Sequence, residues 1–283
     1  MLDLLFGAYG LTLLFLVLVN VALASSLNLI TGFAGQVSIG HIAFYAIGAY
    51  TAALLSAGWG WGLWLTLPAA ALVSLAAGVL IGAPSLRVEH DFLAIVTLGL
   101  GLVVQGLALN LDVTGGPYGI SGVRRAFEGP GAVAGYAAVA GGLAALSVVT
   151  VWRIRDSRIG TALMALRDDA LAAEVAGIHT ARYKVLAFAF GGALAGAAGG
   201  LYAHYATFVS PESFDLAASV SVLAMVVVGG LGTLAGPVLG AAVLTLLPEL
   251  MRFTAEYRML LYGLMLVAIM RYLPRGILGA RGR

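Results

Sequence analysis

Residues 132–152 read AVAGYAAVAGGLAALSVVTVW, an apolar run without a charged side chain. A helix of about 20 residues crosses the roughly 30 Å hydrocarbon layer of a membrane. A transmembrane barrel would instead need segments of about ten residues with alternating polarity. Because this run is longer than that and does not alternate, it predicts a membrane-spanning helix.

The composition of the whole chain points the same way. Apolar residues make up 61 % of the 283 residues and charged residues only 10 %, against roughly 45–50 % and 25 % in soluble domains. So few charges cannot cover the surface of a soluble protein of this length. The small net charge of +2 and the dispersed arginines exclude nucleic acid as a partner, and the lack of cysteine excludes disulfide scaffolds and cysteine-ligated zinc. The sequence therefore predicts an all-α, polytopic integral membrane protein.

The apolar runs predict about nine transmembrane helices, with a range of eight to ten, in a single transmembrane domain over residues 1–283. Two of them, 217–231 and 234–250, are short and separated by a glycine-rich turn, which suggests a re-entrant or broken-helix pair. The glycine-rich, polar stretch 25–40 is either a broken helix that lines a pore or an additional span. The expected spans are 4–24, 41–57, 62–82, 92–110, 132–152, 186–206, 217–231, 234–250 and 257–273.

The first of these runs has some features of a signal peptide, because Ala22-Leu23-Ala24 fits a small-x-small cleavage pattern. Its start, however, carries Asp3 and no positive side chain, and the apolar run is longer than about 15 residues. We therefore expect it to be a retained helix.

The basic residues predict the orientation, because cytoplasmic loops are rich in lysine and arginine. If the segment 153–185 and the tail after residue 270 lie inside, the nine spans place Arg87 inside as well, and eleven of the fifteen basic residues are cytoplasmic. The C-terminus is then cytoplasmic and the N-terminus external. The N-terminus would move inside if 25–40 crossed the membrane by itself.

The segment 153–185 carries ten charged residues and cannot span. Within it, the stretch from Gly160 to Gly177 is a good helix by propensity, with Asp156 or Ser157 as its N-terminal cap and Gly177 at its end. Its apolar residues favour one side. Such a helix docks in a groove of a soluble partner or lies on the lipid surface, and the alternative is a plain solvated loop.

The sequence carries little catalytic chemistry. The one lysine, Lys184, does not follow a glycine, so the chain lacks the P-loop that a Walker-type ATPase needs. The four histidines have no zinc-binding spacing. Gly119-Ile120-Ser121-Gly122 matches the GxSG motif of rhomboid-type intramembrane proteases, with His204 as the available base. Because Ser121 lies in a loop rich in glycine and proline rather than at the head of a buried helix, we do not expect an enzyme.

Polar residues within apolar segments are candidates for a substrate path, and interhelical hydrogen bonds are the alternative for each. No carboxylate lies at the centre of a span, which argues against a proton-coupled pump. The glycine stripe Gly192, Gly196 and Gly200 serves packing inside the chain or a subunit interface. The candidate pathway residues are Asn28, Gln36, Ser38 and His41 around the start of the second span, and Thr97 and Gln105 along the fourth.

Several longer stretches resemble branched-chain amino-acid ABC transporter permeases of the LivM type. The resemblance covers nearly the whole chain in order and spacing. It is carried by LNLITGFAGQVSIGHIAFYAIGAYTAALL from residue 27, LRVEHDFLAIVTLGLG from 86, NLDVTGGPYGI from 110, SRIGTALMALRDDALAAEVAGIHTARYKVLAFAFGGALAGAAGGLYA from 157, SPESF from 210, LAMVVVGGLGTLAGPVLGA from 223 and YGLMLVAIMRYLPRGILG from 262.

This resemblance implies one half of a membrane dimer, usually with a related second permease. It also implies two cytosolic ATP-binding subunits, an extracytoplasmic substrate-binding protein, no cofactor, and a place in the bacterial cytoplasmic (inner) membrane. The segment with Glu174 and Gly177 would then contact the ATPase. The residues expected to couple to the ATPase are Arg167, Asp168, Asp169, Glu174 and Gly177.

The chain departs from the family pattern at two places. It has His90-Asp91 where relatives commonly have Gly-Asp, and Leu102 and Gln105 where an acidic and a basic residue are common. We expect ATPase-driven alternating access that imports a branched-chain or related amino acid. Related permeases for urea or short amides share much of the pattern. The alternative from a different class is an ATP-independent channel or secondary carrier for small polar solutes.

Overall fold

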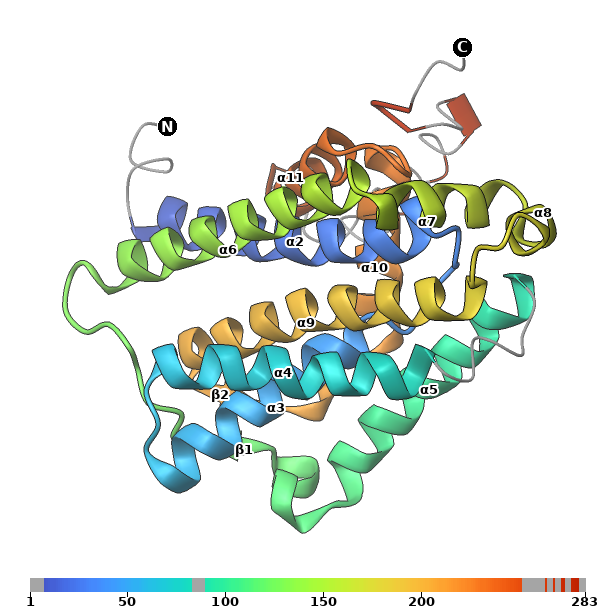
Figure 1. Cartoon of the computed structure of the whole chain (residues 1–283). Coiled ribbons are helices and arrows are strands. Elements are labelled where there is room, and N and C mark those ends of the chain that lie inside the picture. The colour runs from blue at the N-terminus through green and yellow to red at the C-terminus, as the bar shows by residue number, and fades with distance from the viewer. Residues whose placement is uncertain are drawn as a thin grey trace.

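A computed structural model describes residues 8–82 and 90–250, together with 263, 267, 271–272 and 276–279. The main body is a bundle of long helices that run side by side (Figure 1). Helix α9 (Thr180–Ala206) lies at its centre and contacts α2 (Ala8–Asn28), α3 (Ile42–Trp59) and α4 (Leu63–Gly82). Helix α6 (Ala132–Arg155) packs along α2. The fold class is confirmed as all-α.

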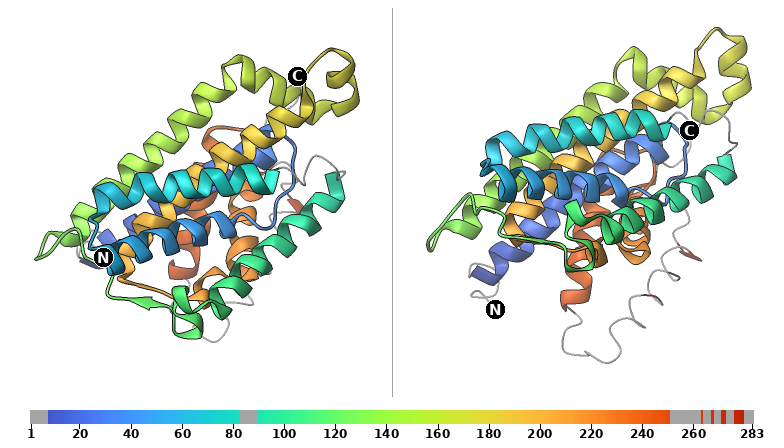
Figure 2. Two further views of the ribbon diagram at one scale, coloured as in Figure 1. Left: turned by 60° about the horizontal axis from the view of Figure 1, so that its bottom comes forward. Right: turned by 90° about the horizontal axis from the view of Figure 1, so that it is seen from below.

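Three more apolar helices complete the bundle. Helix α5 (His90–Asn110) lies obliquely at its edge, and α10 (Leu216–Gly229) and α11 (Ala235–Leu250) pack as a pair against α2 (Figures 1 and 2). The two ends of the bundle differ. One carries α7 (Arg158–Asp168) and α8 (Ala170–Val175). The other carries the antiparallel pair β1 (Ile120–Ser121) and β2 (Phe208–Val209) and three 3₁₀ turns, η3 (Asp112–Thr114), η4 (Gly116–Tyr118) and η5 (Pro211–Phe214).

In the described part of the chain, six helical segments are long and apolar enough to span a membrane. The expected number of about nine is not confirmed. Helix α10 measures about 21 Å at 1.5 Å per residue, which is less than the hydrocarbon layer, and α11 is described only as far as Leu250. Almost all of the expected span 257–273 lies outside the described residues. The six are Tyr9–Phe33, Ile42–Trp59, Leu63–Gly82, Phe92–Asn110, Ala132–Arg155 and Thr180–Ala206.

The stretch 25–40 is a broken helix and not an extra span. Helix α2 runs on to Asn28 and then widens into a π-helix, η1 (Leu29–Phe33). The helical bonds end with Ala34 N–H donating to the Leu29 carbonyl at 3.2 Å. Gly35 takes a positive φ of 67°, which favours glycine, and the chain continues without helical structure to α3.

The segment 153–185 forms two short helices and the start of α9 instead of the single helix expected over 160–177. The break lies at Asp169, whose backbone is extended and whose carboxylate accepts from the N–H groups of Leu171 at 2.9 Å and Ala172 at 3.0 Å. Aspartate favours caps over helix interiors because its short side chain bonds nearby backbone groups. Of the two expected start caps, Ser157 is the one that accepts from the first turn of α7.

The glycine stripe of α9 packs inside the chain. Of the two roles that the sequence leaves open, packing within the chain and a subunit interface, the structure shows the first. A Cβ added at Gly192 or Gly196 would meet Ser74 of α4, and one added at Gly200 would meet Ala70 of the same helix. From the other side, a Cβ at Gly48 of α3 would collide with the backbone of Gly196. These glycines let three helix backbones approach one another closely.

Candidate functional site

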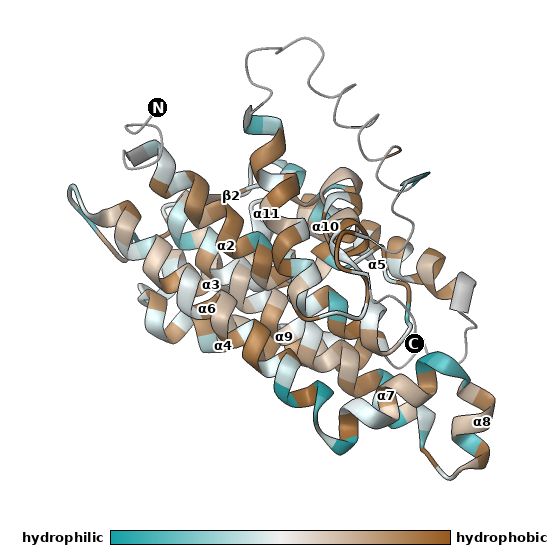
Figure 3. Ribbon diagram, turned by 90° about the horizontal axis from the view of Figure 1, so that it is seen from above, coloured by the Kyte–Doolittle hydropathy of each residue, from teal (hydrophilic) through white to brown (hydrophobic). Residues whose placement is uncertain are grey.

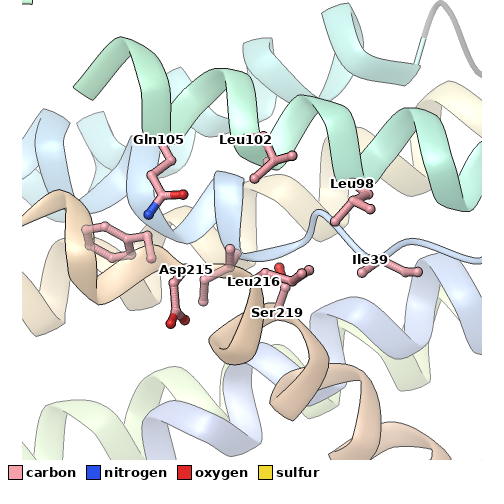
Figure 4. A pocket seen from close by; sticks show the side chains of 10 residues that line it. Ile39, Leu98, Leu102, Gln105, Asp215, Leu216 and Ser219 are labelled. Carbon is pink, nitrogen blue, oxygen red and sulfur yellow. The ribbon is translucent and has the colours of Figure 1, made fainter. Parts of the chain in front are cut away.

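A narrow pocket lies between the middle of α5 and the first turn of α10 (Figure 4). Its free volume of about 10 Å³ has room for about one water molecule, so the pocket would have to widen to admit a larger solute. The α5 residues that line it recur at helical spacing and so share one face of that helix. The lining residues are Ile39, Ile42, Leu98, Gly101, Leu102, Gln105, Phe214, Asp215, Leu216 and Ser219.

The pocket has a polar end and an apolar end. Figure 4 shows Gln105 and Asp215 at one end and Leu98 and Ile39 at the other. The Gln105 Nε2 atom donates to the Pro211 carbonyl at 3.3 Å, and the Asp215 carboxylate accepts from the N–H group of Ala218 at 2.8 Å. Both polar side chains are thus already bonded to backbone groups of the chain.

Two of the six pathway residues expected from the sequence belong to this region. Gln105 lines the pocket itself. Thr97 lies behind it, where its Oγ1 atom accepts from the N–H group of Ile39 at 3.1 Å and donates to the Ala94 carbonyl. Thr97 therefore fixes the pocket wall that Ile39 forms against α5.

The other four expected residues are buried beside η1 and the segment that follows it. Asn28 bonds backbone groups of the α10–α11 turn, and Gln36 Nε2 donates to the Ala34 carbonyl at 3.4 Å. The His41 Nε2 and Ser26 Oγ atoms lie 2.7 Å apart. Among the described residues, Ser38 Oγ and His41 Nδ1 are buried without a hydrogen-bond partner. These side chains support the broken helix rather than line the pocket.

Sequence reasoning missed most of the pocket lining. Leu102 stands out in the sequence because it departs from the family pattern. Nothing in the sequence, however, predicts that it lies close to Phe214 or Ser219. The available signal is the repeat of Leu98, Gly101 or Leu102, and Gln105 at a spacing of three to four residues. That spacing identifies one face of α5 and does not reveal what lies opposite.

The α7–α8 end of the bundle is divided into an anchored part and an exposed part. Leu163 and Leu166 of α7 are buried, and Leu163 belongs to a small cluster with Leu29 and Phe33 of η1. On α8 the side chains of Leu171 and Val175 are 74 % and 84 % exposed. Strongly hydrophilic residues gather around these two helices (Figure 3).

Of the residues expected to couple to an ATPase, four lie on α8 or next to it, and the fifth, Arg167, is exposed on α7 but reaches the bundle with its guanidinium. Asp168 and Asp169 stand at the junction of α7 and α8, and Glu174 is exposed on α8. Gly177 follows α8 with a positive φ of 85°. Arg167 instead donates from Nη1 to the Gly32 carbonyl at 2.6 Å.

The histidine that a GxSG protease would need is occupied by other partners. His204 is buried, with Nε2 2.7 Å from Thr66 Oγ1 and Nδ1 2.6 Å from the Arg124 carbonyl. Ser121 lies in β1, paired with Phe208. The two ring nitrogens of His204 therefore connect α9 to α4 and to the loop that precedes α6.

Comparison with known proteins agrees with this arrangement. Residues 9–270 match the family described as "Branched-chain amino acid transport system / permease component". The chain is 40 % identical to the high-affinity branched-chain amino acid transport system permease protein LivM of Escherichia coli strain K12, over 93 % of this chain and 68 % of that protein. The LivM protein of Salmonella typhimurium is also 40 % identical, over 92 % of this chain and 68 % of its own length.

A more distant similarity extends to a second permease protein. The corresponding LivH protein of Escherichia coli strain K12 is 30 % identical over 48 % of this chain and 44 % of its own length. No solved structure shows a significant match. These similarities do not favour the alternative of an ATP-independent channel or carrier. They do not favour an intramembrane protease either. The chain is a multi-pass membrane protein that belongs to the family of permease components of branched-chain amino acid transport systems.

Proposed function

We propose that this chain is the translocating subunit of an ABC importer for branched-chain amino acids in the bacterial cytoplasmic membrane. The observation that carries the proposal is the match of residues 9–270 to the permease family, with 40 % identity to LivM proteins over almost the whole chain. ATP-driven alternating access moves the solute, and a related second permease forms the other half of the path. An extracytoplasmic binding protein delivers the substrate.

The pocket between α5 and α10, in a wider form, is the proposed substrate site. A branched-chain amino acid combines a zwitterionic head with a hydrocarbon side chain, and the pocket has one polar and one apolar end. The head would lie near Gln105 and Asp215, and the side chain near Leu98 and Ile39. Leu102 and Gln105 replace a charged pair that is common in the family, so they are the first residues to vary in tests of selectivity.

The α8 helix is the proposed docking site for the ATP-binding subunits. Two large apolar side chains, Leu171 and Val175, stand exposed on a helix that also carries Glu174. The sequence has no P-loop lysine, so ATP hydrolysis belongs to the partner subunits. The basic residues of 153–185 support a cytoplasmic position for this end, and the arginines of the tail after residue 270 support a cytoplasmic C-terminus.

The function is tested by purifying the tagged chain from its native membrane, identifying the proteins that copurify, and reconstituting the complex in liposomes. We expect ATP-binding subunits and a second permease to copurify, and labelled leucine to be taken up when ATP and the binding protein are supplied. Recovery of the folded chain alone, with uptake that follows an ion gradient and not ATP, would establish the carrier alternative.

The docking site is tested with the double substitution Leu171→Asp and Val175→Asp. Loss of apolar anchors at the centre of an interface typically costs 2 kcal/mol or more, which is about 30-fold in affinity. We therefore expect recovery of the ATP-binding subunits to fall at least about tenfold, while the amount of permease in the membrane stays unchanged. Thr161→Asp, an exposed substitution on α7, is the matched control. Equal recovery from both variants would refute docking on α8.

A further inference from the structure

The side chain of Arg167 lies at a junction of three parts of the chain that are far apart in sequence. Its Nη1 atom donates to the carbonyl of Gly32 in η1 at 2.6 Å. Its aliphatic part passes over Gly35, where an added Cβ would lie 2.9 Å from Arg167 Cγ. An added Cβ at Gly232, in the turn between α10 and α11, would collide with the guanidinium. Gly35 and Gly232 thus make room for the arginine, and Gly32 supplies the carbonyl that it binds.

Asn28 closes the same junction from the other side. Its Oδ1 atom accepts from the N–H group of Gly232 at 2.9 Å, and its Nδ2 atom donates to the Thr233 carbonyl at 2.8 Å. The side chain is fully buried. Thr233 in turn accepts from the N–H group of Gly236 at the start of α11. The end of α2, η1 and the α10–α11 turn are therefore joined by hydrogen bonds, and Arg167 joins α7 to them.

Two parts of the pocket lining are connected along the chain to this junction. One is Ile39, on the segment that leaves η1 after Gly35, and Thr97 holds that segment against α5. The other is the first turn of α10, with Leu216 and Ser219, and α10 ends at Gly229 beside the α10–α11 turn. A displacement of α7 that is passed on through Arg167 would therefore reach both parts of the lining.

We propose that Arg167 is a positioning residue that links ATPase-driven movement of α7 and α8 to the opening and closing of the pocket. It does not touch the solute. Its guanidinium holds η1 and the α10–α11 turn to the last turn of α7, so that the anchored helix and the pocket walls move together. The inference rests on the proposed docking of ATP-binding subunits on α8. It adds the residue through which the movement reaches the substrate site.

The decisive measurement is the amount of leucine transported per ATP hydrolysed by the reconstituted complex. With Arg167→Ala we expect the ATP-binding subunits to copurify as before and hydrolysis to stay within about twofold of the unmodified complex. Uptake per ATP should fall at least about tenfold. Arg167→Lys keeps one donor to the Gly32 carbonyl and should restore part of the lost coupling. Arg158→Ala removes the same charge from the exposed start of the same helix and should leave the ratio unchanged.

A second readout follows the pocket itself. Because the chain has no cysteine, Leu102→Cys introduces a single thiol at the pocket, and its labelling on this chain can be followed with and without ATP. We expect the ATP-dependent change in labelling to disappear in the Arg167→Ala background and to persist in the Arg158→Ala background. This readout does not depend on completed transport.

The outcomes separate the inference from the proposed function. Unchanged uptake per ATP, or an unchanged ATP-dependent change in labelling with Arg167→Ala, would overturn the role of Arg167. Loss of the ATP-binding subunits from the Arg167→Ala complex would overturn it as well, because Arg167 would then belong to the docking surface. If the unmodified complex shows no ATP-dependent uptake, the proposed function itself fails, whatever the variants do.

Discussion

Gly196→Leu is expected to prevent the permease from accumulating as a folded protein. Gly196 lies in α9 where that helix is closest to both α3 and α4. A Cβ added there would collide with the Ser74 side chain and lie 2.9 Å from the Ala70 carbonyl, and the backbone of Gly196 is itself in contact with Gly48. Overpacking a core costs typically 1–3 kcal/mol. Because two backbones would have to separate here, we expect a loss of free energy of unfolding of at least about 3 kcal/mol.

The matched control is Gly142→Leu, on the exposed face of α6, where nothing lies within 4 Å of an added Cβ. Both variants replace a helical glycine by the same residue, and in a helix leucine is favoured over glycine by up to about 1 kcal/mol. The measurement is the amount of monodisperse protein extracted from the membrane and its thermal unfolding in detergent. Equal yields and unfolding temperatures for the two variants would show that the close approach of α9 to α3 and α4 is not needed for stability.

Leu102→Trp is expected to block uptake while leaving the fold intact. Leu102 lines the pocket but is 53 % exposed, so a larger ring can be accommodated without disturbing the core of the bundle. A site overfilled by 1–3 kcal/mol loses roughly 5- to 150-fold in occupancy. We therefore expect initial rates of leucine uptake to fall at least about fivefold in reconstituted liposomes at subsaturating substrate.

The neighbouring residue supplies the control for this substitution. Val103 is 59 % exposed on the same helix and does not line the pocket. Val103→Trp adds the same side chain one position further on, which turns it to another face of α5. A similar loss with both variants would point to a general effect on α5, and normal uptake with Leu102→Trp would remove the pocket from the transport path.

The spans were predictable from the sequence wherever an apolar run was long enough to cross the hydrocarbon layer as a helix. The run 132–152 became α6, which continues to Arg155, because basic residues are favourable at a helix C-terminus. Helix α9 begins at Thr180, before the expected residue 186, and includes Arg182 and Lys184. Long basic side chains tolerate such positions because their aliphatic stems lie on apolar surface while the charge reaches water.

The candidate site was predictable only in part. Gln105 could be recognised because a polar side chain within an apolar span is expensive and therefore informative. The same argument selected Asn28, but its partners lie in a turn more than 200 residues later in the chain. A sequence shows which polar groups will be buried and does not show which backbone groups will satisfy them. The break at Asp169 also depends on a local choice between capping and helix continuation that propensity alone does not decide.

The short helix α10 has a consequence for biosynthesis. Its 14 residues span about 21 Å, which is less than the thickness of the hydrocarbon layer. The carbonyls of Val228 and Gly229 at its end accept from the N–H groups of Ile277 and Leu278 at 2.8 and 3.0 Å. In lipid, backbone groups of this kind must find partners inside the protein. The end of α10 therefore acquires these partners only after residues 277 and 278 have been synthesised.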